Sequence, residues 1–217
     1  MIRTPSRNPL TLVIGDRQLS SWSLRAWILL KHLGVDFEEV CLRLDTPDFE
    51  QRIGAYSPTR RVPVLLDGAL KVWDSLAICE YANELAGGRG WPEDPAARAH
   101  ARAISAEMHS GFTALRTQWA MQATSVLRVP LDSAGLADAA RIDALWQDAL
   151  DRHGGAGPWL FGRYTIADAM YAPVVLRFVT YGADLSPAAR GYVATTLADP
   201  YLKAWLADAQ AECAAPP

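Results

Sequence analysis

A single segment of the sequence constrains the fold more than any other. Pro63 stands at the head of the apolar run 64–66, and because proline has no amide hydrogen it belongs at the start or edge of a strand. Asp67-Gly68 separates this run from residues 70–73, a pattern typical of a tight β-hairpin. Asp74-Ser75 follows directly and can cap a helix. The segment therefore predicts a free main-chain amide, a carboxylate and a hydroxyl close together, which suits a small peptide with an amine and a carboxylate.

The composition is that of an ordinary globular protein. The chain has 217 residues, half of them hydrophobic, which is enough for one large domain or two small ones. A formal charge of −3 does not indicate nucleic-acid binding, and no apolar run approaches the ~20 residues that span a bilayer. The three cysteines are odd in number and far apart, which favours a reducing cytoplasm over a disulfide framework. Residues 1–9 lack the apolar core of a secretory signal, and we expect a loose arm there.

The first ninety residues alternate strand and helix patterns. The predicted elements are a strand at 12–14, a helix at 22–33, a strand at 37–44, a helix from Thr46-Pro47, the hairpin, and a helix at 75–85. A βαβ unit followed by a helix and a ββα unit makes one small sheet with helices against it.

The second half of the chain reads as helices only, after a break at residues 87–92. Apolar residues at a spacing of three or four predict one long helix over 95–122, and they are Ile104, Met108, Phe112, Leu115 and Trp119. Further helices are predicted at 137–153, 166–181, 187–196 and 200–211, and Thr165 with Asp168 forms a capping-box pattern.

This order of elements resembles the cytosolic glutathione transferases over nearly the whole chain. Three motifs carry the resemblance: the serine turn 20–25, the segment 57–65 with Asp74-Ser75, and the capping box within 161–169. The serine turn is similar to that of the zeta class, the maleylacetoacetate isomerases. The resemblance implies a thioredoxin-like βαβαββα domain over 10–86 and an all-helical domain over 95–213. It also implies a homodimer. From the charge, the apolar runs and the histidine spacing, we expect no metal cofactor, nucleic acid or membrane as a partner.

The resemblance further implies a glutathione site. In this family the proline is cis, and Val62 before Pro63 pairs through its backbone with the cysteinyl part of glutathione. Asp74 is expected to bind the γ-glutamyl amine and Ser75 its carboxylate, although both residues could serve only as helix caps. Arg61 could reach the glycyl carboxylate or remain solvated.

The chemistry expected at the serine turn is stabilisation of the glutathione thiolate. The thiol has an ordinary pKa near ~8.5, and a hydroxyl together with a helix N-terminus favours its charged form. Ser20 is the first candidate because it lies five residues before Arg25, as the family's catalytic residue lies before its arginine. Ser21 is the second candidate, and either serine could instead merely cap the helix.

The sequence indicates structural rather than catalytic roles for the other ionisable and nucleophilic residues. We expect Asp168 to serve in the capping box and Arg25 in a structural ion pair. Cys41 and Cys79 are expected to be buried and inert, and the four histidines show no metal-ligand spacing.

The second substrate is expected to be an apolar electrophile bound between the domains. Met108, Phe112, Trp119 and Met121 are candidates for its wall, although core packing is favoured for most of them. Two departures from the zeta pattern stand out: Trp22 replaces the usual cysteine, and Arg177 lies about one turn from the expected carboxylate-binding arginine. The leading interpretation is therefore a glutathione S-transferase. A glutathione-dependent cis–trans isomerase of the maleylacetoacetate isomerase type and a non-catalytic, glutathione-transferase-like binding protein are the alternatives.

Overall fold

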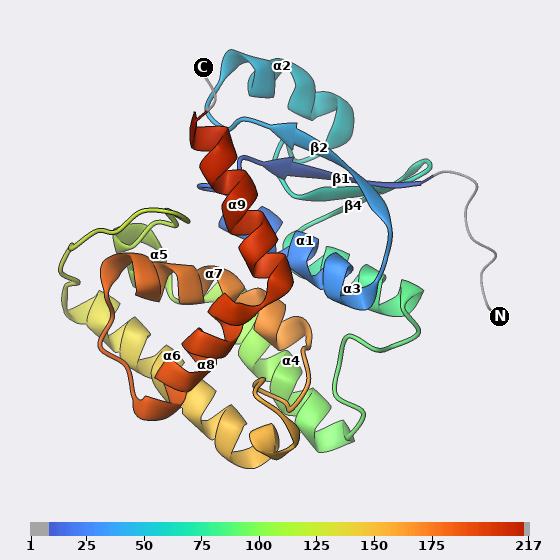
Figure 1. Cartoon of the computed structure of the whole chain (residues 1–217). Helices are drawn as coiled ribbons and strands as arrows, with labels where there is room; N and C mark the ends of the chain where they lie inside the picture. The colour runs from blue at the N-terminus through green and yellow to red at the C-terminus, as the bar shows by residue number, and fades with distance from the viewer. Residues whose placement is uncertain (1–8, 215–217) are drawn as a thin grey trace.

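A computed structural model describes residues 9–214; most of the arm expected at the N-terminus lies outside the described residues. The first part of the chain forms a sheet domain with three helices (Figure 1). Its elements are β1 (Leu10–Gly15), α1 (Ser21–Leu33), β2 (Phe37–Leu42), α2 (Pro47–Tyr56), β3 (Val64–Asp67), β4 (Leu70–Trp73) and α3 (Ser75–Leu85).

The remaining described elements are helical and form the helical domain. They are α4 (Pro95–Ser110), α5 (Thr113–Gln118), α6 (Ser133–His153), the short 3-10 helix η1 (Gly154–Ala156), α7 (Ile166–Tyr181), α8 (Pro187–Ala198) and α9 (Pro200–Ala214). The fold class expected from the sequence, a small mixed sheet domain followed by an all-helical domain, is confirmed. Within residues 9–214, no helix is long and apolar enough to cross a membrane.

The sheet has the strand order β2-β1-β3-β4. β1 runs parallel to β2, with Val13 opposite Val40, and antiparallel to β3, with Val13 opposite Val64. One face of the sheet packs with α2 in a small apolar cluster that includes Phe49 and Ile53. The other face belongs to a large core that continues into the helical domain.

Helix α1 joins the two domains. It packs against α3 on one side and α7 on the other, and ten of its 13 residues are buried. Gly34 ends the helix in the left-handed conformation, which glycine adopts without strain. Helix α7 is buried at 15 of its 16 residues, and its capping box is confirmed: Asp168 accepts a hydrogen bond from the Thr165 amide at 2.8 Å. Asp168 also accepts a hydrogen bond from the Leu160 amide at 3.2 Å.

The single long helix predicted over 95–122 is wrong. Helix α4 ends at Ser110, Phe112 takes a left-handed φ of 57°, and α5 starts at Thr113. A Cβ atom at Gly111 would lie 2.8 Å from the Glu107 carbonyl oxygen, so only glycine fits at this bend. Phe112 is nevertheless buried, because apolar spacing reports which side chains face the core and not whether the helix is continuous.

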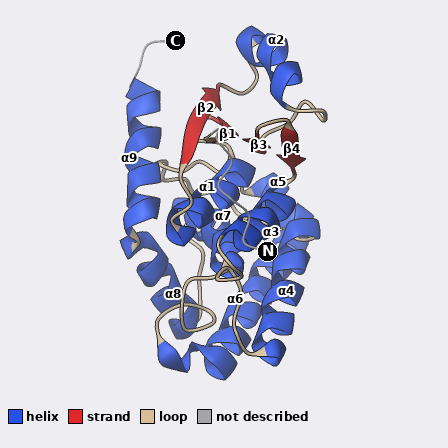
Figure 2. Ribbon diagram, turned by 90° about the vertical axis from the view of Figure 1, so that its right-hand side faces the viewer, coloured by secondary structure: helices blue, strands red, loops and turns tan. Residues whose placement is uncertain are grey.

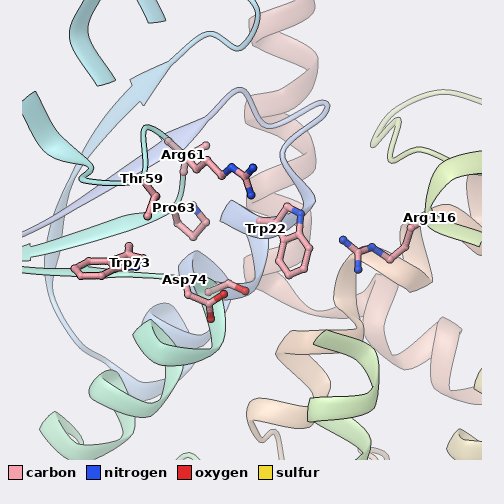
Figure 3. A pocket seen from close by; sticks show the side chains of 9 residues that line it. Trp22, Thr59, Arg61, Pro63, Trp73, Asp74 and Arg116 are labelled. Atoms are coloured by element: carbon pink, nitrogen blue, oxygen red, sulfur yellow. The ribbon is translucent and has the colours of Figure 1, made fainter. Parts of the chain in front are cut away.

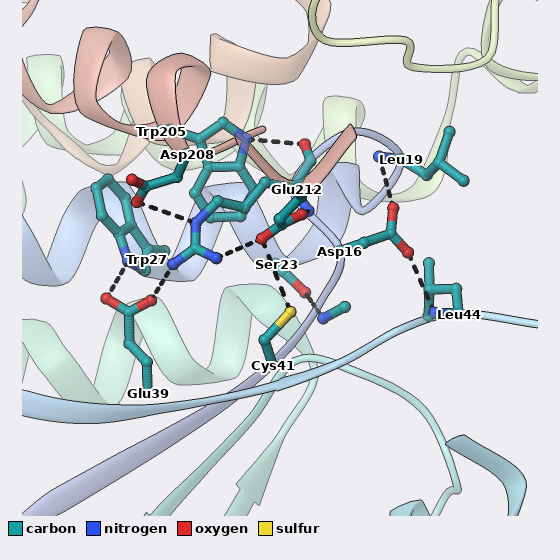
Figure 4. A network of polar contacts seen from close by, with 12 residues as sticks. Asp16, Leu19, Ser23, Trp27, Glu39, Cys41, Leu44, Trp205, Asp208 and Glu212 are labelled. Carbon is teal, nitrogen blue, oxygen red and sulfur yellow. Dashed lines mark hydrogen bonds and ion pairs between the residues drawn. The ribbon is translucent and has the colours of Figure 1, made fainter. Parts of the chain in front are cut away.

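The C-terminal helix α9 crosses back to the sheet domain and lies beside β2 (Figures 1 and 2). Arg17, in the loop after β1, forms the polar part of this contact. Figure 4 shows its partners Glu39, Trp205 and Glu212 close together. Its guanidinium contacts Glu212 at 2.6 Å and Glu39 at 2.5 Å, and its main-chain N–H donates to Glu212 at 2.7 Å. The Trp205 indole donates to the Arg17 carbonyl at 3.0 Å, so α9 is bound through both side chain and backbone.

We expect Arg17→Met to lower the free energy of unfolding by about 1–3 kcal/mol, because it leaves Glu212 and Glu39 without their strongest partner. Urea unfolding followed by circular dichroism measures the change. Arg52→Met is the matched control, since Arg52 pairs with Asp48 on the exposed face of α2, and it is expected to cost less than about 0.5 kcal/mol. Equal losses in the two variants would contradict a specific role for Arg17.

Candidate functional site

A cleft of about 620 Å³ opens between the two domains at the ends of β4 and α1. Figure 3 shows Arg61, Pro63 and Asp74 on the sheet-domain side and Arg116 reaching in from the helical domain, with Trp22 between them. The residues that line the cleft are Trp22, Thr59, Arg61, Val62, Pro63, Trp73, Asp74, Ser75 and Arg116. All five residues predicted for the peptide-binding half therefore meet in one cleft.

The corner before β3 presents its main chain to the cleft. The Val62–Pro63 peptide bond is cis. Within the described residues, the Val62 N–H and C=O have no protein hydrogen-bond partner. Pro63 is buried, whereas Arg61 and Thr59 are exposed at the mouth of the cleft. The corner can therefore offer one donor and one acceptor to an extended peptide, as a neighbouring strand would.

Asp74 is both a helix cap and a cleft residue. Its Oδ1 accepts hydrogen bonds from the Leu76 amide at 2.9 Å and the Ala77 amide at 3.3 Å. Its Oδ2 lies 3.1 Å from Nε2 of His109, on α4 of the helical domain. The φ of Asp74 is 77°, a conformation that costs a non-glycine residue about 1–3 kcal/mol. Such strain is often kept at binding sites, and here it turns the carboxylate towards the cleft.

Ser75 begins α3 and is 1% exposed. Its Oγ is buried and has no hydrogen-bond partner among the described residues, although it lines the cleft. A buried hydroxyl without a hydrogen-bond partner is unfavourable unless a ligand supplies the missing hydrogen bond. Because the amides at a helix N-terminus also attract negative charge, this end of the cleft suits a carboxylate.

The serine turn lies at the start of α1, next to the cleft-lining Trp22. Neither Ser20 nor Ser21 is among the lining residues, whereas Trp22 is. Ser20 occupies the N-cap position but makes no side-chain cap; its Oγ is paired with Ser23 Oγ at 2.7 Å. Ser21 Oγ instead accepts a hydrogen bond from Nη2 of Arg177 at 3.3 Å. A catalytic role for either serine remains a prediction.

The indole of Trp22 lies between two guanidinium groups. The Arg25 carbon Cζ is 4.3 Å from the ring centroid and that of Arg116 is 4.4 Å from it. The His109 ring meets the same indole edge-on, with the ring centroids 5.3 Å apart. Cation–π contacts of this kind hold a guanidinium in place without neutralising its charge.

The ion pair expected for Arg25 is wrong. Arg25 is 1% exposed, and no carboxylate among the described residues pairs with it. Its Nε and Nη1 also have no hydrogen-bond partner in that part of the chain. Burial and the nearby guanidinium groups of Arg177 and Arg116 lower the pKa of Arg25 to about 9. The inner end of the cleft is therefore strongly electropositive.

The sequence did not predict four of the residues that line the cleft, namely Trp22, Thr59, Trp73 and Arg116. Nor did it predict His109, which contacts Asp74 and Trp22 without lining the cleft. Trp22 carried a signal, since it replaces a cysteine usual in the zeta turn, but His109 and Arg116 had none because only the fold brings α4 and α5 to the serine turn. The wall proposed from Met108, Phe112, Trp119 and Met121 does not line the cleft; these residues are buried in the core.

The cysteines lie outside the cleft. Cys79 is buried as expected, but Cys41 is exposed, because β2 is an edge strand of the sheet. Partial burial and the nearby Glu212 carboxylate raise the pKa of the Cys41 thiol to about 11, which makes it a poor nucleophile at neutral pH. Among residues 9–214, no group of three or more histidine, cysteine or acidic side chains is arranged to hold a metal ion.

The sequence matches two family models, the glutathione S-transferase N-terminal domain over residues 19–85 and the C-terminal domain over residues 95–208. The chain is 30% identical to maleylacetoacetate isomerase of Rattus norvegicus over 178 residues, 79% of each protein. It is 29% identical over 175 residues to a probable maleylacetoacetate isomerase of Caenorhabditis elegans, again 79% of each.

Solved structures show the same relationship. A glutathione transferase homologue from Burkholderia with bound glutathione superimposes with a TM-score of 0.70 at 25% identity. The similarity covers 94% of this chain and 99% of that one. The family models match both halves of the sequence, and the fold matches a solved glutathione transferase homologue over nearly its whole length. The chain therefore belongs to the glutathione S-transferase family.

Proposed function

We propose that this protein binds glutathione in the cleft and adds its thiolate to an electrophilic second substrate. The observation that carries the proposal is the meeting of Val62–Pro63 and Asp74–Ser75 in one cleft, with the Ser75 hydroxyl buried and unpartnered among the described residues. The Val62 main chain would pair with the cysteinyl residue, Asp74 with the γ-glutamyl amine, and Ser75 with the γ-glutamyl carboxylate. The glutathione bound to the Burkholderia homologue supports this ligand.

The chemistry requires the glutathione thiol to be ionised near neutral pH. Each unit by which its pKa is lowered needs about 1.4 kcal/mol of preference for the charged form. A hydrogen bond from the Ser20–Ser21 turn to the thiolate is of about this size, and the α1 N-terminus adds a partial positive charge. Arg25, Arg116 and Arg177 act in the same direction. The thiol proton passes to solvent when the thiolate forms. The thiolate then bonds to the electrophilic carbon, and the leaving group departs with the electron pair of the broken bond. Because the thiol is ionised before it attacks, no general base is needed.

The glutathione site is tested by separating ligand binding from protein stability. Because the Ser75 hydroxyl has no described partner, Ser75→Ala is expected to leave the melting temperature unchanged or slightly raised. The same variant should weaken glutathione binding about tenfold or more, since a hydrogen bond to a charged group is worth about 1.5–3 kcal/mol. Titration calorimetry measures the binding, and differential scanning fluorimetry measures the stability.

Asp74→Asn should likewise weaken binding about tenfold, because asparagine still caps a helix but no longer pairs with an amine as a carboxylate does. Asp94→Asn is its control, since Asp94 caps α4 through a bond from the Ala97 amide and does not line the cleft. Absence of glutathione binding by the parent protein would refute the proposal. Binding without conjugation of any electrophile tested would favour the non-catalytic alternative.

A second candidate function is glutathione-dependent cis–trans isomerisation of an acidic substrate. The specific observation is Arg116, a half-buried cation that lines the cleft, is stacked on Trp22, and has no ion-pair partner among the described residues. An anionic second substrate fits this wall better than the apolar electrophile expected from the sequence. In an isomerase, the thiolate would add reversibly to a double bond, which allows rotation before the thiolate leaves again.

Arg116→Gln distinguishes these substrate classes. We expect it to raise the KM for a carboxylate-bearing substrate such as maleylacetone about tenfold, while the KM for a neutral aryl halide changes less than about twofold, since only the former loses a charge-assisted bond. Steady-state kinetics with both substrates provide the measurement. Arg152→Gln, an exposed arginine of α6 that lies outside the cleft, is the control. Equal effects on the two substrates would argue against a carboxylate at Arg116.

The family also leads us to propose a homodimer. Leu70 and Trp73 on the edge strand β4 are 44% and 47% exposed, which is the kind of apolar surface that a second copy would cover. Sedimentation velocity should therefore give the mass of two chains at micromolar concentration. A species with the mass of one chain would contradict the dimer.

A further inference from the structure

The two serines at the start of α1 have different hydrogen-bond environments. Ser20 Oγ pairs with Ser23 Oγ at 2.7 Å, and Ser23 Oγ also accepts from the Gly15 amide at 3.1 Å. A Cβ added to Gly15 would lie 3.0 Å from Ser20 Cβ, so Ser20 is packed tightly against the end of β1. Its hydroxyl is therefore part of the internal bonding that joins β1 to α1.

Ser21 has a hydroxyl proton that no described group accepts. Its Oγ receives a hydrogen bond from Arg177 Nη2 at 3.3 Å, and a hydroxyl has one donor in addition to its acceptor sites. Arginine has no acceptor, so this contact uses only the oxygen lone pairs of Ser21. The O–H bond of Ser21 is thus free to point elsewhere, from a residue directly before the cleft-lining Trp22.

Arg177 is held rigidly from α7 in the helical domain. Its Nε donates to the Trp119 carbonyl at 2.8 Å and its Nη1 contacts the Pro173 carbonyl at 3.4 Å. Arg177 is 4% exposed, and no carboxylate among the described residues pairs with it. Neutral carbonyls fix the guanidinium but leave its positive charge in place, so the charge acts on the Ser21 oxygen and strengthens Ser21 as a donor.

We propose that Ser21 is the residue that donates a hydrogen bond to the glutathione thiolate, and that Arg177 is a positioning residue that orients and polarises the Ser21 hydroxyl. The proposal rests on glutathione being the ligand of the cleft. Both domains would then contribute to the catalytic group, because Ser21 lies on α1 of the sheet domain and Arg177 on α7 of the helical domain.

Other charged groups also surround the start of α1, and the test must separate them from Arg177. Arg25 lies on α1 itself, His109 on α4, Arg116 on α5, and Asp74 precedes α3. A purely long-range effect of Arg177 on the thiolate would resemble theirs and would not need Ser21. A double-mutant cycle between Ser21 and Arg177 makes this distinction.

The experiment measures the pKa of glutathione bound to the enzyme, from the ultraviolet absorbance of its thiolate as a function of pH. We expect Ser21→Ala to raise this pKa by about 1 to 2, as loss of one hydrogen bond to a charged atom would. Ser20→Ala should raise it much less. Arg177→Met should raise it in the parent background but have little further effect when Ser21 is already alanine.

Two variants separate the proposed effect on the thiol pKa from a general loss of folding. Arg177→Lys restores a buried cation, and partial recovery of the low thiol pKa is expected relative to Arg177→Met. Ser21→Ala removes a single oxygen, so it reports on the proposal even if Arg177→Met fails to fold. Melting temperatures and glutathione affinities of all variants accompany the titrations.

Two results would overturn the assignment. The first is a larger increase in the thiol pKa for Ser20→Ala than for Ser21→Ala. The second is an equal effect of Arg177→Met with and without the Ser21 hydroxyl, which would mean that the guanidinium acts on the thiolate directly. Failure of the parent to bind glutathione at all would instead refute the proposed function, and is recognised before any variant is made.

Discussion

The burial of α1 between the two domains is the constraint on which the rest of the structure depends. Ten of the 13 residues of α1 are buried, so other elements must cover it on most sides, and here the sheet and α3 cover one side while α7 covers the other. The two domains therefore share one continuous core and have one fixed relative position. The cleft lies at the N-terminal end of this helix, so the packing of α1 sets the positions of its two walls.

The position of α1 also explains an arrangement that would be unfavourable elsewhere. Arg25, Arg116 and Arg177 gather around the start of α1, where only Arg116 lines the cleft, and they have no carboxylate partners among the described residues. Burying uncompensated charge costs free energy. Carbonyl groups and the Trp22 ring hold the guanidinium groups while leaving their charge available. A site that must stabilise an anion is a physical reason to keep such a cluster, and the strained φ of Asp74 on the opposite wall fits the same explanation.

Much of the fold could be predicted because its signals are local. The hairpin at Asp67-Gly68, the end of α1 at Gly34 and the capping box of α7 each depend on residues a few positions apart. The break at Gly111 was missed because the apolar spacing continues across it, and the exposure of Cys41 was missed because strand order is not a local property. Arg25 was misjudged for the same reason, since its neighbours in space come from α5 and α7.

The sequence by itself determined the half of the cleft for which we propose glutathione as the ligand, because Val62, Pro63, Asp74 and Ser75 lie within one hairpin and its flanking residues. Their relative positions follow from turn and cap geometry over 14 residues, numbered 62 to 75. Only the tertiary structure decided the other half. His109, Arg116 and Arg177 are brought to the serine turn by the packing of the helical domain on α1, and this packing depends on contacts between residues far apart in the chain. The hydrogen-bond partners of Ser21 also depend on such a distant contact, the one with Arg177, and no local sequence pattern predicts it.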